Sequence, residues 1–306
     1  MSYTTRIKDE ISQAENTNSE IIAELSAFIR NNATLEDNSL YLTTENKNIA
    51  ARIKRFITGT YDIKIYHTTK NNLNFKENKI NVLQIKDKLN LILKDIGYLD
   101  QEGNYLDTPP TYIVGANEEI RAYLRGVFLS QGSINDPKTS QYHMELTILK
   151  AQEAVFIQKL LNLFDLNAKI LDRDKGYMIY IKEAEKISDY LKILRANTCV
   201  MYFENIRIYH EEKNKTNRLN NCEQANIDKV VQTAQEQLKY IDIIEKNLGV
   251  DLLDDKTKEA LEYRRKYPEA SLKELSEIIT LETGNKITKS GLNHRFRKIK
   301  ELAQKF

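Results

Sequence analysis

Basic side chains are concentrated near the end of this sequence. From Lys286 to Lys305 there are seven lysines and arginines and one acidic residue, Glu301, an excess of six positive charges. The complete chain of 306 residues has a net charge of only +2. Charge clustered on one helix is the footprint of a protein that binds DNA phosphates and base edges. A basic helix taken alone is more often a solvated surface, so this segment is a candidate nucleic-acid interface.

The same segment has an apolar face that would anchor it in a domain. Residues Leu292, Phe296, Ile299 and Ala303 recur at helical spacing. In a helix that lies in the major groove, the N-terminal residues usually meet base edges. We therefore assign base recognition to four polar residues and phosphate binding to four basic ones. The predicted base-reading residues are Ser290, Asn293, His294 and Arg297, and the predicted phosphate-binding residues are Lys289, Arg295, Lys298 and Lys300.

A second helix is predicted directly before the basic one. Ser271 and Glu274 have the spacing of a capping box, in which the hydroxyl and the carboxylate each satisfy a backbone amide at the start of a helix. Pro268 ends the preceding helix. Gly284 lies in the connection, which is longer than the turn of about three or four residues usual for a helix-turn-helix. The exact geometry of the pair is therefore open at this point.

The remaining residues that could bind metal or react are scattered. Cys199 and Cys222 are far apart with no CxxC pair, which excludes a disulfide scaffold and a thiolate zinc site. The histidines outside the basic segment are His67, His143 and His210. We expect no metal ion and no cofactor. No apolar run approaches the roughly 20 residues of a membrane span, and the first ten residues lack a signal sequence, so we expect a cytoplasmic protein.

The first two thirds of the chain contain an internal repeat. The same order of elements (helix, strands, helix, strands, helix) is predicted twice, and this repetition favours a duplicated α/β unit. The helices are predicted at 19–29, 47–57, 86–96, 117–130, 151–164 and 183–194, and the strands at 40–44, 62–67, 79–85, 142–149, 168–171 and 177–181. The segments that begin at Leu25 and Leu124 align at an offset of about 99 residues and place Ala27 and Gly126 at the same point of an apolar helix. A glycine inside a helix costs about 1 kcal/mol against alanine, so we expect two helices that cross closely there.

Strand patterns disappear after about residue 201. We predict an α+β protein with an all-α C-terminal domain, divided into 1–110 and 111–200 (the two repeats), 201–224 (a polar linker) and 225–306. The linker has basic residues Arg207, Lys213, Lys215 and Arg218, which are either a solvated surface or a minor DNA contact.

Three motifs together resemble one bacterial family. The chain is similar, in three places and in the same order, to the WhiA family of DNA-binding proteins. The similar segments are 121–137 with 142–146, then 218–226, and then the pair 268–275 and 288–298. The resemblance covers essentially the whole chain. It implies a pseudo-twofold N-terminal domain similar to LAGLIDADG homing endonucleases. It also implies a C-terminal helix-turn-helix similar to region 4 of sigma factors.

The chain departs from active nucleases of that fold at the residues that matter for cleavage. The resemblance implies that the metal-binding acidic positions correspond to Asn32 and Gln131, and the other acidic position of the motif to Arg30 and Leu129. Mg²⁺ prefers carboxylate ligands, and phosphodiester cleavage needs the metal. Asp136 and Glu145 match no known ligand spacing. We therefore predict a degenerate, non-catalytic domain and a protein that is not an enzyme.

The resulting hypothesis is a sequence-specific regulator that binds double-stranded DNA and is associated with the nucleoid. The resemblance implies roles in cell division and chromosome segregation, or in sporulation in some bacteria, with transcription or cell-division proteins as candidate partners. Two alternatives remain open: a metal-dependent endonuclease, and a protein-interaction scaffold with weak DNA binding.

Overall fold

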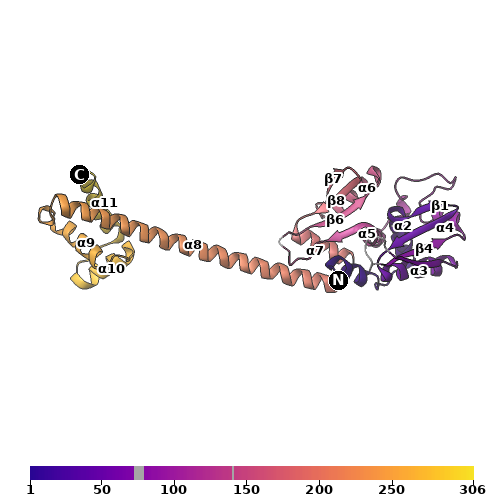
Figure 1. The fold of residues 1–306 in the computed structure, drawn as a ribbon, viewed down its shortest axis with the longest axis horizontal. Helices are drawn as coiled ribbons and strands as arrows, with labels where there is room; N and C mark the ends of the chain where they lie inside the picture. Colours follow the sequence, from indigo (N-terminus) through magenta and orange to yellow (C-terminus); the bar gives the residue numbers. More distant parts are fainter. Residues whose placement is uncertain (72–78, 140) are drawn as a thin grey trace. The chain divides into compact units, whose positions relative to one another are not determined.

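The structure is a computed structural model and describes residues 1–71, 79–139 and 141–306. It divides into two compact units, residues 1–210 and 211–306 (Figure 1). Each unit has its own apolar core.

The first unit contains the predicted repeat. The first copy comprises α2 (Asn18–Asn32), β1 (Thr34–Glu36), β2 (Ser39–Thr44), α3 (Lys47–Tyr61), β3 (Tyr66–Asn71), β4 (Lys79–Ile85) and α4 (Leu89–Asp95). The second comprises α5 (Asn117–Gln131), β5 (Gly132–Ile134), β6 (Met144–Ile148), α6 (Ala151–Asn162), β7 (Lys169–Arg173), β8 (Gly176–Ile181) and α7 (Ala184–Ile193). The helix α1 (Tyr3–Ile11) precedes the first copy, and the short 3-10 turn η1 (Thr111–Ile113) precedes the second. The α+β, pseudo-twofold prediction is confirmed.

The two sheets have the same antiparallel topology. Their strand orders are β1-β2-β4-β3 and β5-β6-β8-β7. The central pairs place apolar residues opposite one another, Leu42 against Leu83 and Leu146 against Ile179. All four of these side chains are buried. Alternating burial along strands of this kind gives each sheet one face toward a helix layer.

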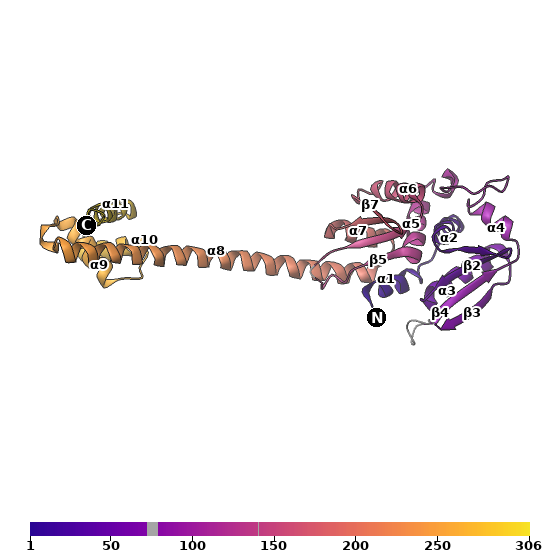
Figure 2. The ribbon, with the colours of Figure 1, turned by 45° about the horizontal axis from the view of Figure 1, so that its top comes forward.

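The helices α2 and α5 lie side by side along their length between the two sheets (Figure 2). At the crossing, a Cβ added to Gly126 would lie 2.3 Å from the carbonyl oxygen of Glu24 and 2.8 Å from the Cβ of Ala27. No real side chain tolerates such distances, so the glycine is required by the close approach of the helices. The crossing predicted from Ala27 and Gly126 is confirmed.

Several local predictions differ from the structure. The helix predicted at 19–29 begins earlier and ends later, as α2, and its N-cap is Thr17 with Glu20 in a capping box. The strand predicted at 62–67 begins only at Tyr66, because Asp62 adopts a left-handed conformation that ends α3. The helix α1 and the short strands β1 and β5 were not predicted, since each is too short to show a clear period.

The second unit contains only helices among the residues that the structure describes. The helix α8 (Asn197–Asn247) begins in the first unit, and its residues from Glu211 onward belong to the second. It is followed by η2 (Val250–Leu252), α9 (Asp255–Lys266), α10 (Leu272–Thr283) and α11 (Lys289–Ala303). The segment 201–224, predicted as a linker, lies within α8.

Candidate nucleic-acid interface

The helix α11 is held in the second unit by its apolar face. Leu292, Phe296 and Ile299 are buried in one cluster with Leu275 and Ile279 of α10. Thr288 caps the helix by accepting a hydrogen bond from the backbone amide of Gly291 at 3.1 Å. Burial of one face and a hydroxyl cap at the start explain why a strongly basic sequence forms a stable helix here.

The preceding helix and the connection are fixed by local hydrogen bonds. The predicted capping box is present: the Ser271 amide donates to Glu274 Oε2 at 2.8 Å, and the Glu274 amide donates to Ser271 Oγ at 3.2 Å. Gly284 ends α10 in a left-handed conformation with φ of 72°. In the longer connection that follows, the Ile287 amide donates to Thr280 Oγ1 at 3.1 Å. The connection is therefore tied back to α10, which fixes the position of α11 relative to it.

The four predicted base-reading residues share the exposed face of α11. These residues are Ser290, Asn293, His294 and Arg297, and all four are exposed. Within the described ranges, none of these side chains makes a hydrogen bond or an ion pair. Donors and acceptors that are exposed and unengaged are available to a partner without breaking an internal contact.

The four predicted phosphate-binding residues fall into two groups. Arg295 donates to Glu259 Oε2 and to the Lys256 carbonyl oxygen, and Lys298 pairs with Asp254. These two side chains therefore tie α11 to α9 and to its N-cap. Lys298, with Thr257, holds the pKa of the Asp254 carboxyl down at about 2.

The other two lysines are not engaged in ion pairs among the described residues. Lys300 is exposed, with its ammonium 5.8 Å from the centre of the Tyr240 ring. Lys289 lines a small recess at the start of α10 together with Lys229 and Lys273. These lysines add positive charge beside the exposed face of α11.

Asn32 and Gln131, which the resemblance predicts to be degenerate nuclease positions, have structural partners. The Asn32 side-chain amide donates to the Thr43 carbonyl oxygen, and its Oδ1 accepts from the Thr43 amide, both at 2.9 Å. Gln131 Nε2 donates to the Asn31 carbonyl oxygen at 2.6 Å. Asn32 thus continues the pairing of β2, and Gln131 joins the end of α5 to the end of α2.

Arg30, which the resemblance predicts to stand at the motif's other acidic position, also has a role in packing. The guanidinium of Arg30 donates to the carbonyl oxygens of Leu106 and Gly97, and it lies over the rings of two tyrosines, Tyr98 and Tyr105. Arg30 therefore holds the segment after α4 against α2.

No cluster of histidine, cysteine and carboxylate side chains suited to a metal ion occurs in the parts of the chain that the structure describes. Asp136 accepts a hydrogen bond from the hydroxyl of Tyr202 at 3.2 Å, whereas Glu145 contacts His143 at 3.1 Å. The two carboxylates are thus engaged with separate partners.

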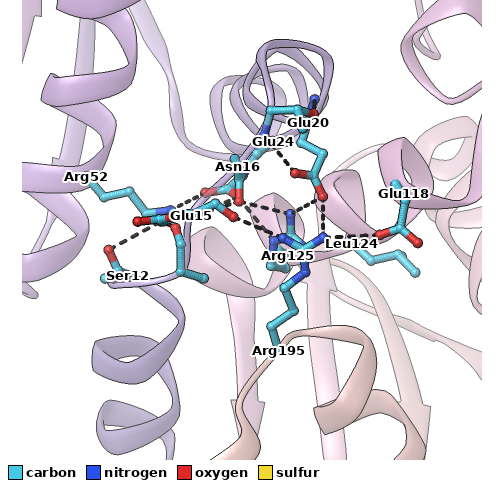
Figure 3. A network of polar contacts seen from close by, with 12 residues as sticks. Ser12, Glu15, Asn16, Glu20, Glu24, Arg52, Glu118, Leu124, Arg125 and Arg195 are labelled. Atoms are coloured by element: carbon cyan, nitrogen blue, oxygen red, sulfur yellow. Dashed lines mark hydrogen bonds and ion pairs between the residues drawn. The ribbon is translucent and has the colours of Figure 1, made fainter.

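A buried charge network, which sequence reasoning missed, joins the two repeats beside the crossing of α2 and α5 (Figure 3). Glu24 accepts from Arg52 Nε at 2.5 Å and from Arg125 Nε at 3.3 Å, and all three side chains are fully buried. Arg195 contacts Glu20 at 2.6 Å at the edge of the network. The sequence signal for this network was a charged residue among the apolar positions of each of three predicted helices, namely Glu24, Arg52 and Arg125.

The geometry defines a class of protein: a duplicated α/β domain joined to a helical domain with a capped basic helix. Family models match in the same order: the WhiA N-terminal LAGLIDADG-like domain at residues 18–99, the WhiA LAGLIDADG-like domain at 120–213 and the WhiA C-terminal HTH domain at 216–303. The chain belongs to the WhiA family, as its resemblance predicted.

Individual relatives agree with this assignment. Proteins named probable cell division protein WhiA from Exiguobacterium sibiricum and from Bacillus cereus are each 38% identical over the whole chain, covering 96% and 97% of those proteins. The crystal structure of full-length DUF199/WhiA from Thermatoga maritima has the same fold, with a TM-score of 0.59 at 20% identity, and the match covers 100% of this chain and 99% of that one. Among the described residues, no helix is long and apolar enough to cross a membrane.

Proposed function

We propose that this chain is a bacterial sequence-specific DNA-binding protein that regulates transcription, and that α11 reads duplex DNA in the major groove. The observation that carries the proposal is the exposed face of Ser290, Asn293, His294 and Arg297 on a capped, positively charged helix. The second helix of a helix-turn-helix is the one that enters the groove. The match of residues 216–303 to a helix-turn-helix family supports the same assignment.

Phosphate binding is assigned to Lys289, Lys300, Arg295 and Lys298. The first two are free of ion pairs within the described part of the chain, so we expect them to contribute most. Arg295 and Lys298 must share their charge with Glu259 and Asp254, and we expect smaller contributions from them.

The relatives named as probable cell division proteins support a role of this chain in cell division. We also propose a role in chromosome segregation, or in sporulation in other hosts. In the proposed function, the protein works in the cytoplasm on the nucleoid, with transcription or cell-division proteins as partners. The proposed domain boundaries are 1–110, 111–200, 201–224 and 225–306.

The LAGLIDADG-like domain is proposed to be non-catalytic. Asn32 and Gln131 support a non-catalytic domain. The side-chain amides of both residues form hydrogen bonds with backbone atoms, and neither supplies the negative charge that a metal ion needs. The scaffold alternative, in which DNA binding is weak and non-specific, is separated from the proposal by its salt dependence. Phosphate-only binding shows a slope of about −0.9 per contact and little preference between sequences.

The test is selection of host DNA fragments by the full chain, followed by affinity measurements on the selected site and on a random duplex. Arg297→Ala should lose about 1–3 kcal/mol on the selected site and much less on the random duplex. Arg265→Ala is the matched control, since Arg265 pairs with Asp242 and Glu245 on α8 and lies outside α11. Equal losses on both duplexes would contradict base reading by Arg297, and the absence of any preferred fragment would favour the scaffold.

A further inference from the structure

A pocket of the first unit lies where the C-terminal ends of α2 and α5 meet the first sheet. It has a volume of about 900 Å³ and lies within one unit. Its walls come from α1, β2 and the start of α3, with Thr5, Thr43, Thr44 and Asn46 among the lining residues. Sites for small molecules in proteins measure about 300–1,000 Å³, so the pocket has the size of a metabolite site.

The pocket has an excess of positive charge. Among the lining residues that the structure describes, three are lysines, Lys8, Lys47 and Lys79, and one is a carboxylate, Glu45. A phosphate monoester carries about −1.5 to −2 charges at neutral pH, which matches this excess of two. Hydroxyl groups of the threonines on α1 and β2 add donors that suit phosphate oxygens.

Lys8 is the residue that sets this pocket apart from an ordinary basic surface. Its side chain is partly buried, and its ammonium makes no hydrogen bond or ion pair with any residue that the structure describes. The ammonium lies 5.7 Å from the centre of the Phe128 ring. Burial lowers the pKa of the Lys8 ammonium to about 8. A desolvated cation without a counter-charge is unfavourable, and an anion that enters the pocket would relieve that cost.

We propose that this pocket binds a small organic phosphate, whose phosphate group is held by Lys8 and Lys47 and whose organic part fills the remaining volume. The volume exceeds what inorganic phosphate needs, which favours a larger ligand. DNA fits less well, because Lys8 is partly buried before any ligand binds, whereas the lysines assigned to DNA on α11 are exposed. The site is independent of the proposed function of α11 and would give the LAGLIDADG-like domain a ligand of its own.

The test measures how fast each lysine of the full-length protein is acetylated near neutral pH, read by peptide mass spectrometry. The probes are inorganic phosphate, adenosine 5′-monophosphate and glucose 6-phosphate, each compared with sodium chloride at equal ionic strength. We expect phosphate-bearing probes to slow acetylation of Lys8 several-fold, with at least one organic phosphate effective at lower concentration than inorganic phosphate. Lys169 is the internal control, because it is an exposed lysine on β7 outside the pocket.

Binding is then measured by calorimetry with the most protective probe. Lys8→Met, which keeps the length of the side chain and removes the charge, should weaken binding by about tenfold or more, and Lys169→Met should leave it unchanged. Equal acetylation of Lys8 with every probe would overturn the proposal. Protection by a short DNA duplex alone would also overturn it and would assign the pocket to a DNA-binding surface. Loss of specific DNA binding in Arg297→Ala should leave Lys8 acetylation and phosphate binding unchanged. The phosphate-pocket proposal and the proposed DNA reading by α11 can therefore be contradicted independently.

Discussion

Glu24 is the acidic residue at which arginines from two other helices meet. Arg52 of α3 and Arg125 of α5 both contact its carboxylate in a fully buried site. Removal of one partner from a buried ion pair leaves an uncompensated charge, which typically costs about 3–5 kcal/mol. We expect Glu24→Gln to lower the free energy of unfolding of the first unit by this amount in urea denaturation.

A surface ion pair of the same unit provides the control. Asp189 contacts Lys192 at 2.9 Å, but both side chains are largely exposed. Asp189→Asn should change the free energy of unfolding by less than about 0.5 kcal/mol. Similar losses in the two variants would show that the Glu24 network does not stabilise the domain.

Asn32 tests whether the degenerate site still has a role in DNA binding. The two hydrogen bonds to Thr43 are each worth about 1 kcal/mol, so Asn32→Ala should lower the stability of the first unit by about 1–2 kcal/mol. Affinity for the selected duplex should remain nearly unchanged, as it should for Gln131→Ala. A large loss of affinity in either variant, measured under conditions where the protein is folded, would place this surface on the DNA.

The residue-scale details were largely hidden from the sequence. The sequence has amides at Asn32 and Gln131, which the resemblance predicts to be the metal-binding positions, but it could not show that both bond to backbone atoms. Arg52 and Arg125 lie among apolar positions, but a charged residue in an amphipathic helix is normally assigned to the solvent face, and Lys8 gave no signal. Only the three-dimensional packing shows that Arg52 and Arg125 are buried and that Lys8 is partly buried.

At the scale of elements, the crossing of α2 and α5 depends on Gly126. The Cβ of an alanine would collide with the backbone of α2, which cannot shift as a flexible side chain does. Overpacking of this kind costs about 1–3 kcal/mol, more than the roughly 1 kcal/mol that alanine gains in helix propensity. We expect Gly126→Ala to lower the melting temperature of the first unit, as measured by calorimetry.

Gly59 provides the comparison for this variant. It also lies in a helix, α3, but an added Cβ there meets nothing within 4 Å. Gly59→Ala should therefore keep or raise stability through its helix propensity. A stabilising effect of Gly126→Ala would mean that the two helices separate more easily than the structure indicates.

The contact between α9 and α11 predicts how the second unit responds to acid. The pKa of Asp254 is lowered to about 2 by Lys298 and Thr257, whereas an aspartate in an unfolded chain titrates near 3.9. Its stabilising effect is complete above about pH 4 and is lost as the pH falls toward 2. Thermal unfolding of the second unit should therefore show a falling midpoint across this range, and Asp254→Asn should reduce that dependence. If the unfolding midpoint of Asp254→Asn falls with pH as steeply as that of the unmodified protein, the acid sensitivity comes from other carboxylates.

Element order was well predicted because its signals are periodic and local. The capping box at Ser271 and Glu274, the apolar face of α11 and the offset between Leu25 and Leu124 were all visible in the sequence. The start of β3 was misplaced because apolar residues at 63 and 65 extend the pattern through a turn. The roles of Arg295 and Lys298 stay predictions, and their contacts with α9 depend on residues about forty positions away.

At the scale of the whole molecule, incubation of the full chain with Mg²⁺ and host DNA should retain a few fragments without cutting them. The physical reason is the lack of carboxylates at positions 32 and 131. Fragment lengths and retention are read in the same gel. Discrete cutting that disappears with a chelator would contradict the non-catalytic assignment, and sequencing of retained fragments would identify the targets.

The two copies of the repeat are fused in one chain, and this frees them from a restriction that a homodimer obeys. In a symmetric dimer every substitution occurs twice, on both sides of the axis. Here one side of the crossing has Gly126 and the other has Ala27, so only one helix needs a residue without a side chain. Asn32 bonds within its own copy, whereas Gln131 bonds to the other one. Fusion thus allows one half to specialise while the other conserves the shared architecture.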